Sequence, residues 1–214
     1  MADENWYRNK IWNDKIEKYF MDKLNKARSQ KVQYIKIQTF YLLAKYPSIA
    51  LKLIKYSREI KIDEFWEQEY CLYESKAFYA LKEYSLALEK AFESIEWRRK
   101  KPCVRTENIY LLAELVLRTK QKNEYQRSIN TMKEMYEETP FPIDKYRYHG
   151  FNALLLNELG YKNDAISESR IALEWANRDK NLLDNMRKRK YGLIKSKLDW
   201  PYMELQKLSK MEFV

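Results

Sequence analysis

The stretch LNELGYKNDAISESRIALEW, Leu156–Trp175, carries small residues where two helices would have to meet. These are Gly160, Ala165 and Ala172, and the two alanines lie seven residues apart, about two helical turns. A small side chain on each helix lets two backbones approach, while the surrounding leucine, isoleucine and aromatic side chains close over the contact. The stretch therefore predicts a helical hairpin.

Composition favours the same kind of structure along the whole chain. The chain has 214 residues, of which 45% are hydrophobic and 15% aromatic, enough for one large domain or a short solenoid. Only 3 glycines and 5 prolines supply turns, too few for a many-stranded sheet. Long runs rich in Leu, Lys, Glu and Ala favour helices, so we predict an all-α fold.

The small-residue pattern recurs at intervals of 37, 38 and 40 residues. Four units of the sequence can be aligned at three positions, which we call columns. The first column contains Ala165, the second lies seven residues after it, and the third lies twelve residues before it. Tyr125 and Met132 break the small-residue rule in the third unit. The three columns hold, in chain order, Ala50, Ala87, Tyr125 and Ala165; Ser57, Ser94, Met132 and Ala172; and Gln38, Ser75, Ala113 and Ala153.

This pattern resembles the tetratricopeptide repeat (TPR), which has small residues in its first helix, a Gly-Tyr type turn and two alanines seven apart in its second helix. The resemblance covers roughly residues 30–178, with a period longer than the usual ~34 residues. It implies a right-handed TPR-like solenoid of about four helical hairpins. The two hairpins that carry it best do so through Ala153, Gly160, Ala165 and Ala172, and through Ser75, Tyr84, Ala87 and Ser94.

Flanking helices are expected at both ends of this array, where they would cap exposed apolar faces. The predicted domains are an N-terminal capping helix in 1–28, four hairpins in 29–178, and a basic C-terminal capping helix and tail in 179–214. Predicted N-caps are Ser29, Asp63, Thr106 and Asn123. The capping helices are inferred from the helical spacing of Trp12, Ile16, Tyr19, Phe20, Leu24 and Ala27, and from Leu182, Leu183, Met186, Leu193 and Ile194.

No catalytic constellation is evident. His149 is the only histidine, which excludes a histidine metal cluster, and the three glycines are isolated rather than gathered in a phosphate-binding loop. Cys71 and Cys103 have no metal-ligand spacing; two buried thiols in a reducing compartment are predicted, with one disulfide as the alternative. We therefore expect no enzyme activity, no cofactor and no metal.

The start of the chain is polar and acidic, and its apolar runs are too short to span a bilayer. These features predict a soluble, cytoplasmic protein without a membrane partner. The net charge of +10 is uneven: residues 1–60 hold 13 basic and 6 acidic side chains, whereas 61–97 hold 4 and 9. Separate charged patches are expected rather than one basic face.

The leading functional prediction is a non-catalytic module that binds a protein or peptide with an acidic surface in a concave helical groove. Such a module would act as an adaptor, a regulator, or an immunity or antitoxin-like protein that covers a toxin. The oligomeric state is left open. If the TPR-like register holds, the inner face of the first helices carries Lys76, Tyr79, Tyr110, Glu114, Arg118, Arg147 and Asn157.

Two other classes remain. A nucleic-acid-binding helical repeat would use basic clusters near Trp97 and Tyr191, since cations can contact phosphates while aromatic rings stack on bases. A structural subunit would self-associate through an exposed solenoid end. The two basic clusters are Arg98, Arg99, Lys100 and Lys101, and Arg187, Lys188, Arg189 and Lys190.

Overall fold

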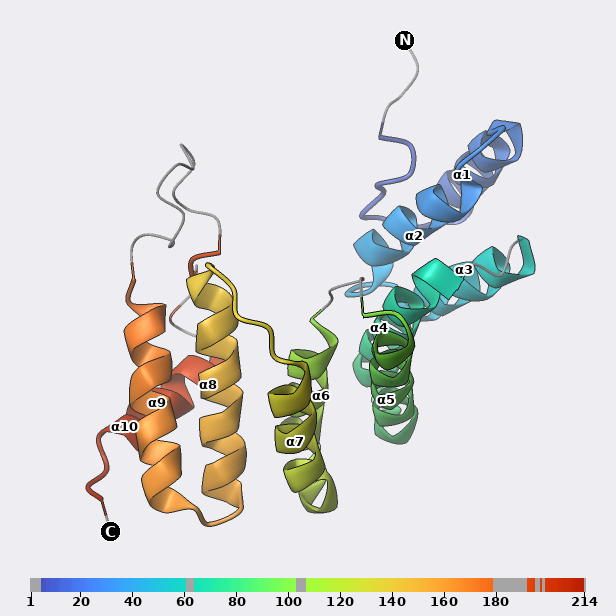
Figure 1. Cartoon of the computed structure of the whole chain (residues 1–214). Helices are drawn as coiled ribbons and strands as arrows, with labels where there is room; N and C mark the ends of the chain where they lie inside the picture. The colour runs from blue at the N-terminus through green and yellow to red at the C-terminus, as the bar shows by residue number, and fades with distance from the viewer. Residues whose placement is uncertain are drawn as a thin grey trace. The chain divides into compact units, whose positions relative to one another are not determined.

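The computed structural model is all-α, because every regular element in the described part of the chain is a helix (Figure 1). The structure describes residues 5–60, 64–102, 107–178, 192–194, 197 and 199–213. The chain divides into two compact units, Met1–Asn108 (unit 1) and Ile109–Val214 (unit 2). Among the described residues, none of the helices combines the length and apolar character needed to cross a membrane.

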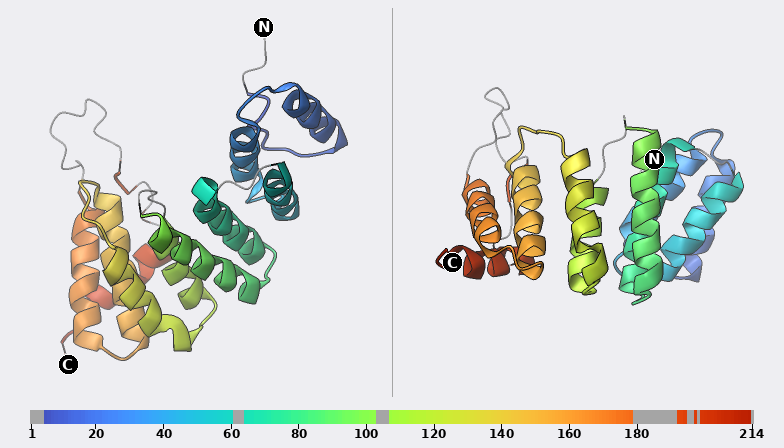
Figure 2. Two further views of the ribbon diagram at one scale, coloured as in Figure 1. Left: turned by 45° about the vertical axis from the view of Figure 1, so that its right-hand side comes forward. Right: turned by 60° about the horizontal axis from the view of Figure 1, so that its bottom comes forward.

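Unit 1 is built from paired helices. Helix α2 packs along α3, α4 packs along α5, and α3 also contacts α4. The pair α4 and α5 lies side by side in both views of Figure 2. The helices of this unit are α1 (Asp14–Lys26), α2 (Lys31–Leu42), α3 (Pro47–Ile60), α4 (Glu64–Ala80) and α5 (Tyr84–Lys100).

Unit 2 is centred on α8, which packs along α9 on one side and contacts α7 on another. The last described helix, α10, crosses both α8 and α9. The elements are α6 (Asn108–Arg118, beginning at the last residue of unit 1), the 3₁₀ turn η1 (Lys122–Glu124), α7 (Tyr125–Met135), α8 (Pro142–Glu158), α9 (Lys162–Ala176) and α10 (Trp200–Ser209).

The aligned columns lie in the interior. All twelve side chains are buried, with Ala50, Ala87 and Ala165 completely so. Small polar members also bond across their hairpin: the Ser75 hydroxyl donates to the Ala87 carbonyl at 2.7 Å, and Ser94 donates to the Gln68 carbonyl at 2.8 Å. Small residues therefore both allow close approach of α4 and α5 and hydrogen-bond across it.

The third pair of helices, α6 and α7, differs from the others in the size of its aligned side chains, as the sequence indicates. Tyr125 and Met132 are buried in α7 where the other units have alanine or serine. The backbones approach closely along α2 and α3, α4 and α5, and α8 and α9, but α7 makes its close contacts with α8 instead of α6. In the other pairs, small residues let the two backbones come into contact. The larger side chains of Tyr125 and Met132 need space that such a close contact would not leave.

Three turns between helices share one conformation. Lys82, Lys120 and Gly160 take left-handed backbone with φ of 65°, 54° and 90°. In each turn the next amide donates to a carbonyl five residues earlier at 2.9 Å, as in a Schellman motif. These turns are separated by the same 38 and 40 residues as the columns. The three bonds run from Glu83 to Phe78, from Gln121 to Val116 and from Tyr161 to Leu156.

Two predicted N-caps are wrong. Helix α2 begins after Gln30, which has left-handed backbone and no side-chain cap bond, rather than at Ser29. Asn123 lies inside the 3₁₀ turn before α7. Asp63 and Thr106 lie outside the described residues.

The flanking segments are described in part. Helix α1 buries Phe20 and Leu24 in the core of unit 1, as the expected opening stripe requires, although Tyr19 from the same stripe is 40% exposed. The closing helix was predicted from five apolar residues, and three of them, Leu182, Leu183 and Met186, lie outside the described residues. The described C-terminal helix is α10, which buries Tyr202, Leu205 and Leu208.

Candidate functional site

Two of the seven residues predicted for partner binding lie in unit 1, on α4. The ammonium of Lys76 forms an ion pair with Glu107. The ring of Tyr79 packs 5.7 Å from the ring of Tyr84 across the turn to α5. Both predicted residues are half-buried, so part of each side chain reaches the surface.

The other five lie in unit 2, and Tyr110 among them is buried at 7% exposure. Its hydroxyl donates to the Asp144 carbonyl at 3.2 Å, and the Arg147 guanidinium lies 5.9 Å from its ring centroid. Tyr110 therefore joins α6 to α8 and offers little surface to a partner. For this residue the expectation of a surface role is replaced by a packing role.

Glu114, Arg118 and Asn157 keep partly exposed side chains with contacts inside unit 2. Arg118 donates to Glu114 at 2.7 Å, one helical turn away, and its guanidinium lies 4.6 Å from the ring of Trp200. Asn157 accepts a hydrogen bond from Lys162 at 2.8 Å. A binding role for these residues stays a prediction.

The first basic cluster is tied into unit 1. Arg98 is 5% exposed and donates to the Asn108 side-chain oxygen at 3.2 Å, so it is an interior residue rather than a phosphate contact. Arg99 pairs with Glu96. Lys100 lies 4.8 Å from the ring of Trp97, and Lys101 pairs with Glu64 at 2.8 Å. The second cluster, Arg187, Lys188, Arg189 and Lys190, lies outside the described residues.

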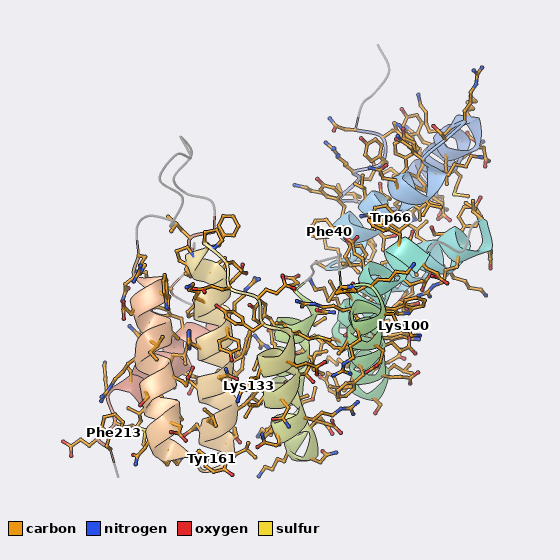
Figure 3. All side chains as sticks on the ribbon, viewed as in Figure 1. Phe40, Trp66, Lys100, Lys133, Tyr161 and Phe213 are labelled. Carbon is orange, nitrogen blue, oxygen red and sulfur yellow. The ribbon has the colours of Figure 1, made fainter. Side chains whose placement is uncertain are left out.

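A different surface of unit 1 combines an exposed aromatic side chain with a connected set of aromatic and charged side chains. We call it the aromatic face and define it by Lys36 and Phe40 on α2 and Trp66, Glu69 and Tyr73 on α4. Figure 3 labels Phe40 and Trp66 on these two helices. Phe40 is 55% exposed, the largest exposure of any phenylalanine in unit 1.

Contacts connect the members of the aromatic face in a continuous chain. The Phe40 ring packs 6.0 Å from the ring of Tyr73, whose hydroxyl donates to Glu69 at 2.6 Å. Glu69 accepts a hydrogen bond from the Lys36 ammonium at 2.8 Å, and that ammonium lies 3.7 Å from the Trp66 ring centroid. The network fixes the rings before any partner arrives, which lowers the entropic cost of binding.

Electrostatics keep this face close to neutral. Burial raises the pKa of the Tyr73 hydroxyl, and its hydrogen bond to Glu69 raises the pKa further, so the phenol stays protonated. The Glu69 carboxylate is matched by the Lys36 ammonium. What the face presents to solvent is therefore mainly aromatic surface beside a fixed, neutralised cation.

This face was not predicted from the sequence, although one signal for it is present there. In α2 the buried positions are Ile35, Gln38, Thr39 and Leu42. Phe40 falls out of phase with them, on the opposite side of the helix. A large aromatic residue out of phase with the core is a candidate for contact with something outside the chain.

A cluster of charged residues joins α3 to α4, with Glu67 and Glu74 buried and Arg58 partly exposed. Arg58 donates to Glu74 at 2.5 and 3.0 Å, and its Nη2 lies 2.9 Å from Glu67. Burial by itself lowers the pKa of the Arg58 guanidinium, but the hydrogen bonds to Glu74 and Glu67 outweigh it and raise that pKa. This cluster holds two helices together and has no exposed reactive group.

Cys71 lies beside this cluster as a buried free thiol. Burial raises its pKa to about 12, and the carboxylates of Glu74 and Glu93 contribute to the shift. The thiol is therefore protonated near neutral pH and a poor nucleophile. Cys103 lies outside the described residues, and within them no group of three His, Cys, Asp or Glu side chains could hold a metal ion.

Comparisons with protein-family models, with curated proteins and with solved structures found no significant match to the chain.

Proposed function

We propose that the protein is a non-catalytic, cytoplasmic binding module that docks a segment of another protein on the aromatic face of α2 and α4. The observation that carries this proposal is the exposed Phe40 ring within a preorganised network of Tyr73, Glu69, Lys36 and Trp66. Rigid aromatic side chains dominate binding hot spots because they bury large areas at a small entropic cost.

The proposal includes a TPR-like architecture of about four hairpins in a right-handed solenoid, flanked by capping helices. Two observations support it. The three aligned columns are buried throughout, and three turns with left-handed Lys82, Lys120 and Gly160 recur at the intervals of those columns. In such an array the first helices of successive hairpins line one surface, and the aromatic face lies on first helices.

A protein of this kind acts by covering its partner. In its most specific form the proposal is an immunity or antitoxin-like protein whose aromatic face blocks a surface that a toxin needs. Adaptor and regulator roles use the same docking chemistry and differ in the partner.

The test is an affinity pull-down from native lysate with nuclease treatment, comparing the wild type with Phe40→Ala and Phe213→Ala. Phe213 is a matched control because it is 56% exposed but lies in unit 2. We expect one stoichiometric protein to survive nuclease with the wild type and Phe213→Ala, and to be lost with Phe40→Ala. Equal retention by all three would reject docking on the aromatic face.

Nucleic-acid binding remains the alternative, to be judged by the same experiment. Retention of nucleic acid, with every protein lost after nuclease, would favour it. In the described part of the chain, the cations of the first basic cluster already contact acidic, amide or aromatic groups of unit 1, so they are poorly placed to bind phosphate.

A further inference from the structure

The charge of unit 1 is distributed unequally between its first hairpin, formed by α2 and α3, and the helix α4 that follows it. Residues 31–60, which include α2 and α3, contain six basic side chains and one acidic side chain, Glu59. Each described carboxylate of α4 already has a basic partner within unit 1. These pairs are Glu64 with Lys101, Glu67 and Glu74 with Arg58, and Glu69 with Lys36.

Excess positive charge therefore remains on the first hairpin. Lys45, Lys52 and Lys55 are exposed and form no ion pair within the described residues. These lysines need not touch a partner, because their field extends over roughly 8–10 Å at physiological ionic strength. Such a field raises the rate at which an acidic segment meets unit 1.

Lys36 provides a direct contact for such a segment. Its ammonium has three N–H donors, of which one bonds to Glu69, while the ring of Trp66 holds it in place. The side chain is 15% exposed, so part of it reaches the surface. Phe40 lies four residues further along α2, on the same side of the helix and one turn away.

We propose that the segment docking on the aromatic face is acidic and carries a large apolar side chain. The apolar side chain packs on the exposed ring of Phe40, which the buried Tyr73 ring contacts from within unit 1, and a neighbouring carboxylate accepts a hydrogen bond from Lys36. This inference rests on the proposed function and adds the chemistry of the partner. The apolar contact gives the larger share of affinity, and the carboxylate selects acidic over basic segments.

The test selects a displayed library of random peptides on the wild-type protein and removes those that also bind Phe40→Ala. We expect the remaining peptides to be enriched in Asp and Glu around an aromatic or aliphatic residue. Synthetic versions, measured by fluorescence anisotropy, should bind Phe40→Ala about tenfold or more weakly. Phe213→Ala should bind them as the wild type does, and circular dichroism should show that both variants are folded.

A second variant tests the charge contribution separately. Lys36→Met with Glu69→Gln removes both charges of the pair while keeping an aliphatic stem over Trp66. We expect this double variant to lose the preference for acidic over neutral peptides, and to show a weaker dependence of affinity on salt.

The outcomes separate the two proposals. Peptides that depend on Phe40 but are neutral or basic would overturn the acidic-partner inference and leave the aromatic face as a docking surface. Selection unaffected by Phe40→Ala, or no selected peptide at all, would overturn both. Persistence of acidic preference in the Lys36→Met, Glu69→Gln variant would also overturn the role of Lys36.

Discussion

Lys82, Lys120 and Gly160 close three helices with the same left-handed backbone, yet only one of them is a glycine. For a residue with a Cβ atom this conformation costs about 1–2 kcal/mol. Glycine avoids that cost but loses about 0.4–1 kcal/mol more through the entropy of its unfolded chain. The strain is the larger effect, so lysine at these positions lowers stability.

Lys82→Gly and Lys120→Gly should each raise the free energy of unfolding by about 0.5–1 kcal/mol, the difference between strain relief and entropy loss. Gly160→Ala should lower it by a similar amount, because a Cβ there meets no atom within 4 Å and only the backbone is strained. Urea unfolding measures all three. Lys52→Gly, in the exposed interior of α3, is the control and should destabilise; stabilisation there would remove the turn-specific explanation.

At Gly192 a larger residue would meet a steric clash in addition to the strain of a left-handed backbone. Its φ is +72°, and a Cβ on it would lie 2.5 Å from Phe141 Cδ1. Its carbonyl also accepts a hydrogen bond from the Ile143 amide at 2.7 Å, at the start of α8. Gly192→Ala should therefore cost more stability than Gly160→Ala in the same urea experiment. Equal costs would show that Phe141 yields without penalty.

Residue patterns predicted the interior better than the surface. Small residues at helical spacing identified buried positions because burial depends on volume and periodicity, which a sequence displays. The caps at Asn13 and Asp199 were missed, although both side chains accept the expected amide hydrogen bond, from Ile16 and Tyr202. More than one such residue can precede a helix, as Asn9 and Asn13 do before α1, and tertiary packing decides which one begins it.

Between elements, α3 and α4 are joined by the paired contacts of Arg58 with Glu67 and Glu74. Glu67 and Glu74 are each 8% exposed, so removing the guanidinium leaves two poorly hydrated negative charges. Arg58→Met should cost about 3–5 kcal/mol of unfolding free energy, measured by urea denaturation.

Replacing the carboxylates as well provides the control for this prediction. Glu67→Gln and Glu74→Gln, added to Arg58→Met, should restore part of the lost stability because no buried charge then remains unpaired. If the triple variant is less stable than Arg58→Met alone, the cost comes from lost packing and not from unpaired charge.

Helix spacing is set by the volume of the aligned side chains. Ala87→Met should overfill the close contact between α4 and α5 and cost about 1–3 kcal/mol. Met132→Ala should leave a cavity in α7 and cost about 2–5 kcal/mol. Thermal unfolding followed by circular dichroism measures both. If Ala87→Met leaves the stability unchanged, α4 and α5 can move apart at no cost, which would contradict the role assigned to the small residues.

Element order was predictable because helices and turns leave local signals. The looser approach of α6 and α7 was indicated in the sequence by Tyr125 and Met132, which are larger than the alanines and serines of the other units. The partner of α7 was not, since the close contact of α7 with α8 depends on packing between distant segments.

For the whole molecule, uneven charge was visible in the sequence, but the site was not. The residues predicted to bind were placed by an assumed register, and Tyr110 and Arg98 are interior residues. The aromatic face joins α2 to α4, and Lys36 and Glu69 are 33 residues apart in sequence. Such pairing follows from the tertiary fold, which a local pattern does not specify.

Docking of a protein segment on the aromatic face is tested most directly by the affinity of the captured partner, measured by isothermal titration calorimetry. Binding to Phe40→Ala should be about tenfold to a hundredfold weaker than to the wild type, and binding to Phe213→Ala should be unchanged. An affinity unaffected by Phe40→Ala but reduced by Phe213→Ala would place the docking surface in unit 2 and rule out docking on the aromatic face.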